Sequence, residues 1–478
     1  MNIAAQFSLG KPGKACPNDP QSPMHILILA DWLGETRTSV PPGEGRPVKI
    51  DIDNFYQVMA KMGPSLSLDD HEKLDFSDIE DFHPDRLCQR LSSLKDLVLL
   101  YKGLDDPVRL RELMDQLHQP KDPSPTSPAS ADRATELEQL LGGRPTEQAR
   151  DTAGESRVRK LIGEVVSPHL IDTRSAEPHR QAVLARLIEE MNAVLQDPRF
   201  QSLEANWRGL WWLVSQLVSE DIQLALLPMN REELMLDLQA AGADLEKTAI
   251  HRQIVGNSGR PSWSLVLGLH EFGPDVEDIM ALTAIAMIAE AAAVPFIASA
   301  SPCLVGCDEP RNLVDPVLWK VGPEEEALDL WQSLRQSSAG HWIGLVVPGV
   351  LARLPYAPAT DPIESFEFSE HFADGNGLPM FSGALAAAAA LGINFENHGD
   401  RMNPTTPVAL QDLPGFSFSR DGEACFQSAV EVALPDRAMD GLIQQGLTPL
   451  AGAVNRTDVY VPACYALSGG ALRGRWHR

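Results

Sequence analysis

The sequence predicts an α/β protein, because short apolar runs with strand character alternate with longer stretches of helical periodicity. The 478 residues are too many for one core, so we expect about three lobes of ordinary domain size. Hydrophobic residues make up 44% of the chain and charged residues 22%, a balance typical of globular proteins. The chain has no repeat of fixed period, which argues against solenoids and propellers.

Composition narrows the possible partners and cofactors. The formal net charge of -26 opposes contact with a phosphate backbone, so we expect no nucleic-acid partner. The six cysteines include no CxxC pair and have no nearby His to complete a zinc site, which fits a reducing cytoplasm. We expect no cofactor. Residues 1–20 lack the apolar run of a signal peptide. The most apolar stretch, 281–300, is interrupted by Glu290 and Pro295, so we expect a buried helix and a strand without membrane insertion.

Residues 24–119 are predicted to form a small α/β unit after a flexible N-terminus at 1–23. The unit opens with the apolar strand HILILADW, and a Pro/Gly-rich loop leads to a second strand, VKIDI. Helical spacing follows in DNFYQVMAKM, with Asp53 as the predicted N-cap. SLSLD and KLDF alternate like short strands. HPDRLCQRLSSLKDLVLLYKGL has the period of one amphipathic helix, and PVRLRELMDQLHQ predicts a last helix.

A linker is expected at residues 120–134, PKDPSPTSPASADRA, which combine four prolines with several serines and show no apolar periodicity. Residues 135–178 follow as a polar segment with a short predicted helix, TELEQLLGG, and one apolar island, KLIGEVV. Because this segment has no obvious core of its own, we expect it to dock on another surface.

Residues 179–478 are predicted to form the main α/β domain. Helices are expected in HRQAVLARLIEEMNAVLQD, RFQSLEANWRGLWWLVSQL, REELMLDLQA and the nearly all-apolar FSGALAAAAALG. Strands are expected in DIQLALLPMN, SWSLVLGLHEF, VPFIASAS and HWIGLVVPGVL.

Three groups of side chains offer candidate chemistry, and each also has a structural interpretation. The acidic run at 69–72 (Asp-Asp-His-Glu) lies on a predicted turn, where adjacent side chains diverge, so a solvated turn is favoured over a metal site. His270 and Glu271 are candidates for an acidic catalytic site, although the helix dipole alone explains carboxylates at the next helix start. Cys303 and Cys307 have apolar flanks that favour two buried thiols. The chain has no nucleophile elbow, P-loop or HExxH motif.

Residues 199–217 place three of the nine tryptophans close together. On a helix, Trp207 and Trp211 fall on one apolar face, which favours a buried core over a partner surface. Trp212 lies about 100 degrees round the helix from Trp211. It therefore either widens the buried face or meets a second surface.

The same stretch, DPRFQSLEANWRGLWWLV, resembles the signature of the large subunit of the type VI secretion contractile sheath, the TssC family. Further blocks resemble that family in the same order: LHEFGPDVEDI, IAEAAAVPFIASASPCLVG, HWIGLVVPGVLARLPYAP, VALQDLPGF and VEVALPDR. HILILADWLG, VKIDIDNFYQVMAKMGPSLSL and LDFSDIEDFHPDRLCQRLSSLKDLVLLYKGL resemble the small sheath subunit, the TssB family. The chain thus looks like a TssB–TssC fusion with the Pro/Ser linker at the junction.

This resemblance implies sheath-type mixed α/β domains, TssB-like at 24–119 and TssC-like at 135–178 and 179–478. Subunits of such sheaths intertwine into protomers that stack around an inner tube and contract. The implied partners are other sheath protomers, the inner tube protein and baseplate components, in the bacterial cytoplasm. An AAA+ ATPase disassembles such sheaths by recognising a helix, and the corresponding region contains Leu137, Leu140 and Leu141.

The resemblance also implies interface or structural roles for residues in the matching motifs. These are Asp31, Asp53, Asn54, Phe55, Trp207, Arg208, Gly209, Trp212, Glu271, Phe272, Gly273, Pro274, Arg353, Pro355 and Tyr356. The chain departs from the family at 380–385, where MFSGAL replaces LWGNAA, and we expect it to lack the C-terminal tail whose strands join protomers.

Two functions follow from the sequence. The first is a structural sheath component, either a fused sheath subunit or a sheath-derived cap or baseplate accessory that packs on sheath ends. The second is a soluble enzyme with an acidic site around His270 and Glu271. Because no motif supports catalysis, the structural function is favoured.

Overall fold

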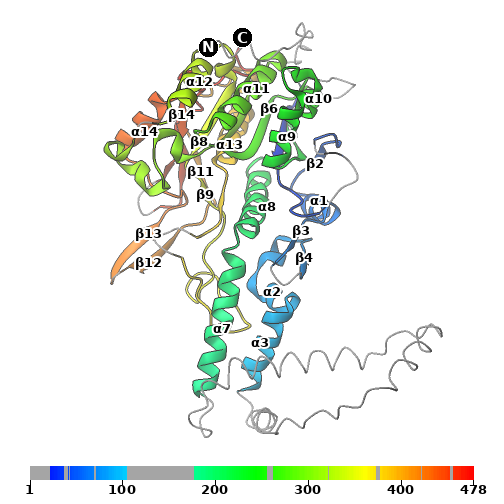
Figure 1. Cartoon of the computed structure of the whole chain (residues 1–478), viewed down its shortest axis with the longest axis vertical. Coiled ribbons are helices and arrows are strands. Elements are labelled where there is room, and N and C mark those ends of the chain that lie inside the picture. The colour runs from blue at the N-terminus through cyan, green and yellow to red at the C-terminus, as the bar shows by residue number, and fades with distance from the viewer. Residues whose placement is uncertain are drawn as a thin grey trace, which may run out of the picture. The chain divides into compact units, whose positions relative to one another are not determined.

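The computed structural model confirms the α/β class (Figure 1). It describes residues 22–36, 41, 43–68, 72–104, 177–255, 262–320, 322–372, 377–420, 422–452 and 456–477. The predicted linker, the helices expected within 105–143, the island KLIGEVV and most of the acidic run at 69–72 lie outside the described residues.

The chain divides into two compact units. From its length we expect about three lobes. The first unit consists of Met1–Phe82, Gln196–Pro355 and His371–Arg478. The second unit consists of His83–Leu195 and Tyr356–Glu370.

A seven-stranded sheet lies at the centre of the first unit, in the order β14-β8-β7-β6-β1-β5-β2. Its strands are parallel to their neighbours, except that β2 runs antiparallel to β5. The strands are β1 (Met24–Ala30), β2 (Val48–Ile50), β5 (Ile222–Pro228), β6 (Leu265–Phe272), β7 (Phe296–Ala300), β8 (Ile343–Val347) and β14 (Leu447–Pro449). Every residue of β1 is buried, as expected for a parallel strand covered on both faces.

Strand β1 lies inside this sheet although it comes from the N-terminal part of the chain. Met24–Ala30 pair with Ile222–Pro228 of β5 on one side, and Ile26–Leu29 pair with Leu265–Gly268 of β6 on the other. Residues up to Phe82 belong to the first unit and the helices that follow them belong to the second. Pairing between strands so distant in sequence leaves no local signal.

Helices cover both faces of the sheet. Helices α11 (Val276–Ala292) and α13 (Gly383–His398) both pack on β6, β7 and β8. Phe296 of β7 belongs to the core that includes α11, whereas the Ser299 hydroxyl bonds that of Ser382 at the start of α13, 2.7 Å away. Side chains an odd number of positions apart in a strand face opposite ways, so the two helices lie on opposite faces. The other helices of the unit are α1 (Phe55–Met62), α8 (Pro198–Gln216), α9 (Arg231–Ala241), α10 (Ala249–Ile254), α12 (Glu325–Gln336) and α14 (Asp436–Gln444).

Shorter strand pairs complete the first unit. The strands expected in SLSLD and KLDF are confirmed as a pair, β3 (Ser65–Ser67) with β4 (Lys73–Asp75). Figure 1 shows β12 and β13 as a hairpin apart from the main sheet. The remaining strands are β9 (Val350–Leu351), β10 (Met380–Phe381), β11 (Val408–Leu410), β12 (Phe416–Arg420), β13 (Glu423–Gln427), β15 (Ala451–Gly452) and β16 (Val459–Val461).

The described part of the second unit contains α2 (Pro84–Arg90), α3 (Ser92–Gly103) and α7 (Glu177–Leu195). The prediction of one helix through α2 and α3 is wrong, because Leu91 has extended backbone angles (φ -80, ψ 122) and separates them. The break lets α2 and α3 contact each other, which two halves of one straight helix cannot do. Helix α3 also packs against α7 (Figure 1), where the Arg180 guanidinium lies 4.7 Å from the centre of the Tyr101 ring.

Among the described residues, no helix has both the length and the apolarity that crossing a bilayer requires.

Candidate functional site

Helix α8 carries the tryptophan signature and begins at a well-defined cap. The Asp197 carboxylate accepts the backbone N–H groups of Arg199 and Phe200, at 2.8 and 3.4 Å, and Pro198 occupies the first helical position. Phe200, Leu203 and Trp207 are buried along one face. The sequence therefore fixes both the start of α8 and the face that it buries.

Trp207 lies at the centre of an aromatic cluster. Its side chain is fully buried, and its ring centre lies 5.3 Å from that of Trp32 and 5.8 Å from that of Phe55. Phe55 also contacts Trp211, with ring centres 5.0 Å apart. Because Trp32 follows β1 and Phe55 opens α1, the cluster packs the N-terminal part of the chain against α8.

The two adjacent tryptophans of α8 differ in their burial. Trp211 is only half-buried, whereas Trp212 is buried. Trp212 stacks on Phe381, with ring centres 5.4 Å apart, and its indole N–H donates to the carbonyl oxygen of Gln411 at 3.1 Å. Helix α8 thus has apolar neighbours on more than one side. Trp211 is less buried than expected, whereas Trp212 meets a second surface, which is one of the two outcomes expected for it.

Gly209 marks a close approach between α8 and its neighbours α13 and β10. A Cβ atom at this position would lie 2.7 Å from side-chain atoms of both Leu385 and Phe381. Any larger residue at 209 must push these elements apart.

A buried ion cluster ties α8 to the segment that follows β9. Glu204 is fully buried, and its Oε1 accepts hydrogen bonds from the Nε atoms of Arg208 at 2.8 Å and Arg353 at 2.9 Å. Arg353 is itself buried and also donates to the carbonyl oxygen of Leu354 at 3.1 Å. Charge-assisted bonds of this kind compensate the cost of removing the carboxylate from water. Sequence reasoning singled out both arginines but missed Glu204, although it stands four positions before Arg208 on the same helix.

The EFGP motif forms the turn from β6 into α11. Phe272 is fully buried, and the Gly273 N–H donates to Oδ2 of Asp278 at 2.6 Å. Asp278 is buried and forms an ion pair with Arg231 at the start of α9. Half-buried Pro274 lies within the turn. The motif therefore positions α11 relative to β6 and α9, and Asp278 is a second residue that sequence reasoning missed.

His270 and Glu271 do not form a site together. His270 is buried, and burial, followed by the charge of Arg231, lowers the pKa of its imidazole to about 4. Glu271 is exposed and lines a separate cavity of about 330 Å³ with Glu431. Burial raises the pKa of Glu431 to about 7, while the Gly349 N–H lowers it and the charge of Glu271 raises it further. This geometry does not support the alternative of an acidic catalytic site.

The two cysteines of SPCLVGCD differ in burial. Cys307 is buried, and burial raises the pKa of its thiol to about 11. Cys303 is half-buried, so the expectation of two buried thiols holds for Cys307 and not for Cys303.

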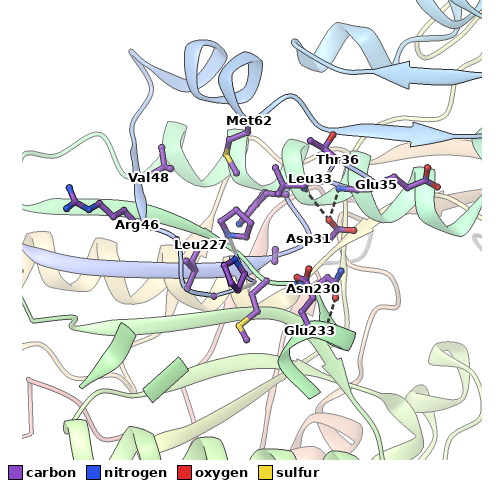
Figure 2. Close-up of a pocket in the computed structure, with 18 of the residues that line it drawn as sticks. Asp31, Leu33, Glu35, Thr36, Arg46, Val48, Met62, Leu227, Asn230 and Glu233 are labelled. Carbon is purple, nitrogen blue, oxygen red and sulfur yellow. Dashed lines mark hydrogen bonds between the residues drawn. The ribbon is translucent and has the colours of Figure 1, made fainter. Parts of the chain in front are cut away.

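Asp31 borders the cavity shown in Figure 2, which lies where β1 and β5 end. Its carboxylate accepts the backbone N–H groups of Leu33 and Gly34, at 3.2 and 2.7 Å, while burial raises its pKa. Asn230 and Glu233 line the same cavity, of about 710 Å³, where they bond each other's backbone N–H and cap α9. These polar groups are engaged in their own turns, so Asp31 has a structural role in ending β1.

The start of α1 differs from the predicted cap. Asn54, and not Asp53, is the N-cap, and its side chain makes no capping bond. Instead Asp51 and Asn54 bond reciprocally, because the Asp51 carboxylate accepts the N–H of Asn54 at 2.9 Å and Asn54 Oδ1 accepts the N–H of Asp51 at 3.1 Å. Asp53 is exposed, and Phe55 supplies the buried contact.

Pro355 and Tyr356 lie at the point where the chain passes from one unit to the other, and both are buried. Within the second unit, the Tyr356 N–H donates to Oε2 of Glu370 at 2.9 Å, and its ring centre lies 5.1 Å from that of His83. Leu137, Leu140 and Leu141 lie outside the described residues.

The described signature residues thus lie in separate places, most of them buried, with Asp53 and Glu271 exposed, and they do not meet in one reactive cleft. Within the described ranges, no group of three or more His, Cys, Asp or Glu side chains is placed to hold a metal ion. The arrangement supports a role for these residues in packing within the chain.

Comparisons with known proteins match both parts of the chain. The family model described as EvpB/VC_A0108, tail sheath N-terminal domain (VipB), matches residues 181–465. The model described as Type VI secretion system, VipA, VC_A0107 or Hcp2, matches residues 18–121. The type VI secretion system sheath protein TssC1 of Pseudomonas aeruginosa is 30% identical over 322 residues, which are 64% of this chain and 64% of that protein.

Proposed function

The chain belongs to the VipB tail sheath family, and we propose that it is a structural component of a type VI secretion contractile sheath with both sheath subunits fused in one chain. Residues 24–119 correspond in this proposal to the small subunit, 120–134 to the linker, and 135–178 with 179–478 to the large subunit. In this proposal the chain acts by packing against other proteins, and it neither catalyses a reaction nor uses a cofactor.

The observation that carries this proposal is the position of β1. This strand lies within the VipA match, and its neighbours β5 and β6 lie within the VipB match. A sheet that includes strands from both matches supports one fused protomer over two independent modules. The contact of Trp32 with Trp207 supports the same interpretation.

The proposed partners follow from the family. They are other sheath protomers or subunits, the inner tube protein and baseplate components, in the bacterial cytoplasm. A further proposed partner is an AAA+ ATPase, which would recognise the segment around Leu137, Leu140 and Leu141. A cap or baseplate accessory on sheath ends is the second version of the same structural role.

Complementation of a bacterium that lacks its own two sheath genes tests the proposal. If the chain is a fused protomer, a fluorescently tagged copy forms long dynamic filaments and restores secretion. If it is an end accessory, the tagged chain forms foci at sheath ends only when the separate sheath genes are present. Diffuse fluorescence in both backgrounds would contradict the proposal. Glu271→Ala tests the enzyme alternative, which predicts loss of secretion, so unchanged secretion in this variant would contradict that alternative.

A further inference from the structure

The described segment Leu472–His477 reaches back to the start of β1. Arg475 is buried, and its guanidinium donates hydrogen bonds to the backbone carbonyl oxygens of Ser22 at 3.1 Å and Pro23 at 3.0 Å. These two residues directly precede β1. A residue close to the C-terminal end of the chain therefore holds the backbone at the entry to a central strand.

The same guanidinium connects β1 to the start of β6. It donates to the Ser264 hydroxyl at 3.1 Å, and Ser264 directly precedes β6. Ser264 in turn exchanges hydrogen bonds with the backbone of His25, through its N–H at 2.8 Å and its hydroxyl at 3.2 Å. Arg475 thus contacts the residues that directly precede both strands.

The positive charge of Arg475 is balanced by the carboxylate of Asp400, which follows α13. Its Nε donates to Oδ1 of Asp400 at 2.6 Å, just beyond the end of α13, and its guanidinium lies 5.0 Å from the centre of the Phe395 ring. A planar guanidinium can satisfy a carboxylate, two carbonyls and a hydroxyl at once, which a lysine ammonium cannot do in this geometry.

The chain around Arg475 holds its side chain in place. The Arg473 N–H donates to the carbonyl oxygen of His341 at 3.0 Å, and the Trp476 indole N–H donates to that of Leu472 at 2.9 Å. A Cβ atom at Gly474 would lie 2.5 Å from the Trp476 ring, so this tight turn requires glycine. Arg475 lies outside the VipB match at 181–465.

We propose that Arg475 is a latch that holds the N-terminal end of β1 in register between β5 and β6. The latch concerns the folding of the chain and does not depend on the proposed sheath function. It fixes the strand of the VipA-like part at the point where that strand enters the sheet of the VipB-like part.

Hydrogen exchange of the full-length chain, measured by mass spectrometry, tests this latch. Arg475→Met should speed exchange of peptides covering 24–28 by about tenfold or more, because hydrogen bonds to a charged group are lost there. Exchange in β8 should stay unchanged. Arg335→Met is the matched control, since Arg335 donates to the carbonyl oxygens of Leu467 at 2.9 Å and Gln444 at 2.8 Å near β14, and should leave β1 protected.

Conservative variants separate a latch from a general structural role. Arg475→Lys keeps the charge opposite Asp400 and should restore part of the protection at 24–28. The pKa of His25 is lowered by burial and then by the charge of Arg475, so His25 should titrate at higher pH in Arg475→Met. Uniform loss of protection across all strands, or unchanged exchange at 24–28, would overturn the proposal. If Arg475→Met does not fold, Asp400→Asn gives the same test with a smaller expected change.

Discussion

Glu204 is a carboxylate at a fully buried position, and its two arginine partners determine what its removal costs. Replacing a buried ion cluster with apolar residues is often nearly neutral, but removing one partner leaves uncompensated charge. Glu204→Gln should therefore lower the free energy of unfolding by about 3 kcal/mol. Urea titration followed by tryptophan fluorescence measures this change.

An exposed ion pair supplies the control. Glu189 lies 2.9 Å from Arg186 on the surface of α7, and Glu189→Gln should cost less than about 0.5 kcal/mol, because water already screens the charges. Equal effects of the two substitutions would show that the buried charge of Glu204 contributes no more to stability than an exposed charge.

Glu431 makes stability depend on pH in a defined direction. Its pKa is raised from 4.5 to about 7, so the folded protein holds a proton that the unfolded chain has lost between these values. The resulting stabilisation is fully present below about pH 4.5 and is lost as the pH rises through about 7, with a maximum of about 3 kcal/mol.

Glu431→Gln should remove this contribution, since glutamine stays neutral. The difference between the unfolding free energies of the original and variant chains should then change between pH 5 and pH 8. Buried His270 has a lowered pKa, which makes stability rise with pH and so acts in the opposite direction. Its contribution is the same in both chains and cancels when their unfolding free energies are compared. A difference that is constant with pH would contradict the assignment.

At the scale of elements, local pattern predicted most strands and helices of the described chain. The apolar runs correctly located β1, β5, β6, β7 and β8, because a buried strand consists of consecutive apolar residues that can be recognised locally. The break at Leu91 escaped prediction. The sequence left two positions open for Trp212, because its neighbour Phe381 comes from another part of the chain. The contact of Glu204 with Arg353 joins residues 149 positions apart and has no local signal beyond the motifs themselves.

The packing of α8 against α13 gives a prediction at this scale. Gly209→Val should lower the free energy of unfolding by at least about 2 kcal/mol, because the added carbons overlap Leu385 and Phe381. Gly470→Val is the control, since no atom lies within 4 Å of a Cβ atom at that position. Thermal unfolding that is equally affected in both variants would contradict close packing at Gly209.

At the scale of the whole molecule, the sequence predicted the α/β class but not the placement of β1. An apolar strand such as MHILILA is compatible with any position covered on both faces, so its composition cannot choose β5 and β6 as neighbours. The same holds for Arg475, whose partners include Ser22 and Pro23 from the opposite end of the sequence.

Charge sets the conditions under which copies of the chain can associate. With a formal net charge of -26, copies repel each other at low ionic strength, and salt screens this repulsion. Raising NaCl from about 50 mM to about 500 mM, where the screening length falls below 10 Å, should increase the assembled fraction measured by analytical ultracentrifugation. A decrease would show that attractive charge pairs dominate the contacts.

Electron cryomicroscopy of the purified full-length chain tests the central claim most directly. The account predicts helical tubules, or rings in the case of an end accessory, whose density shows one chain per protomer with β1 between β5 and β6 of the same chain. A sample that remains monomeric at high concentration, or an assembly in which β1 is separated from that sheet, would contradict it.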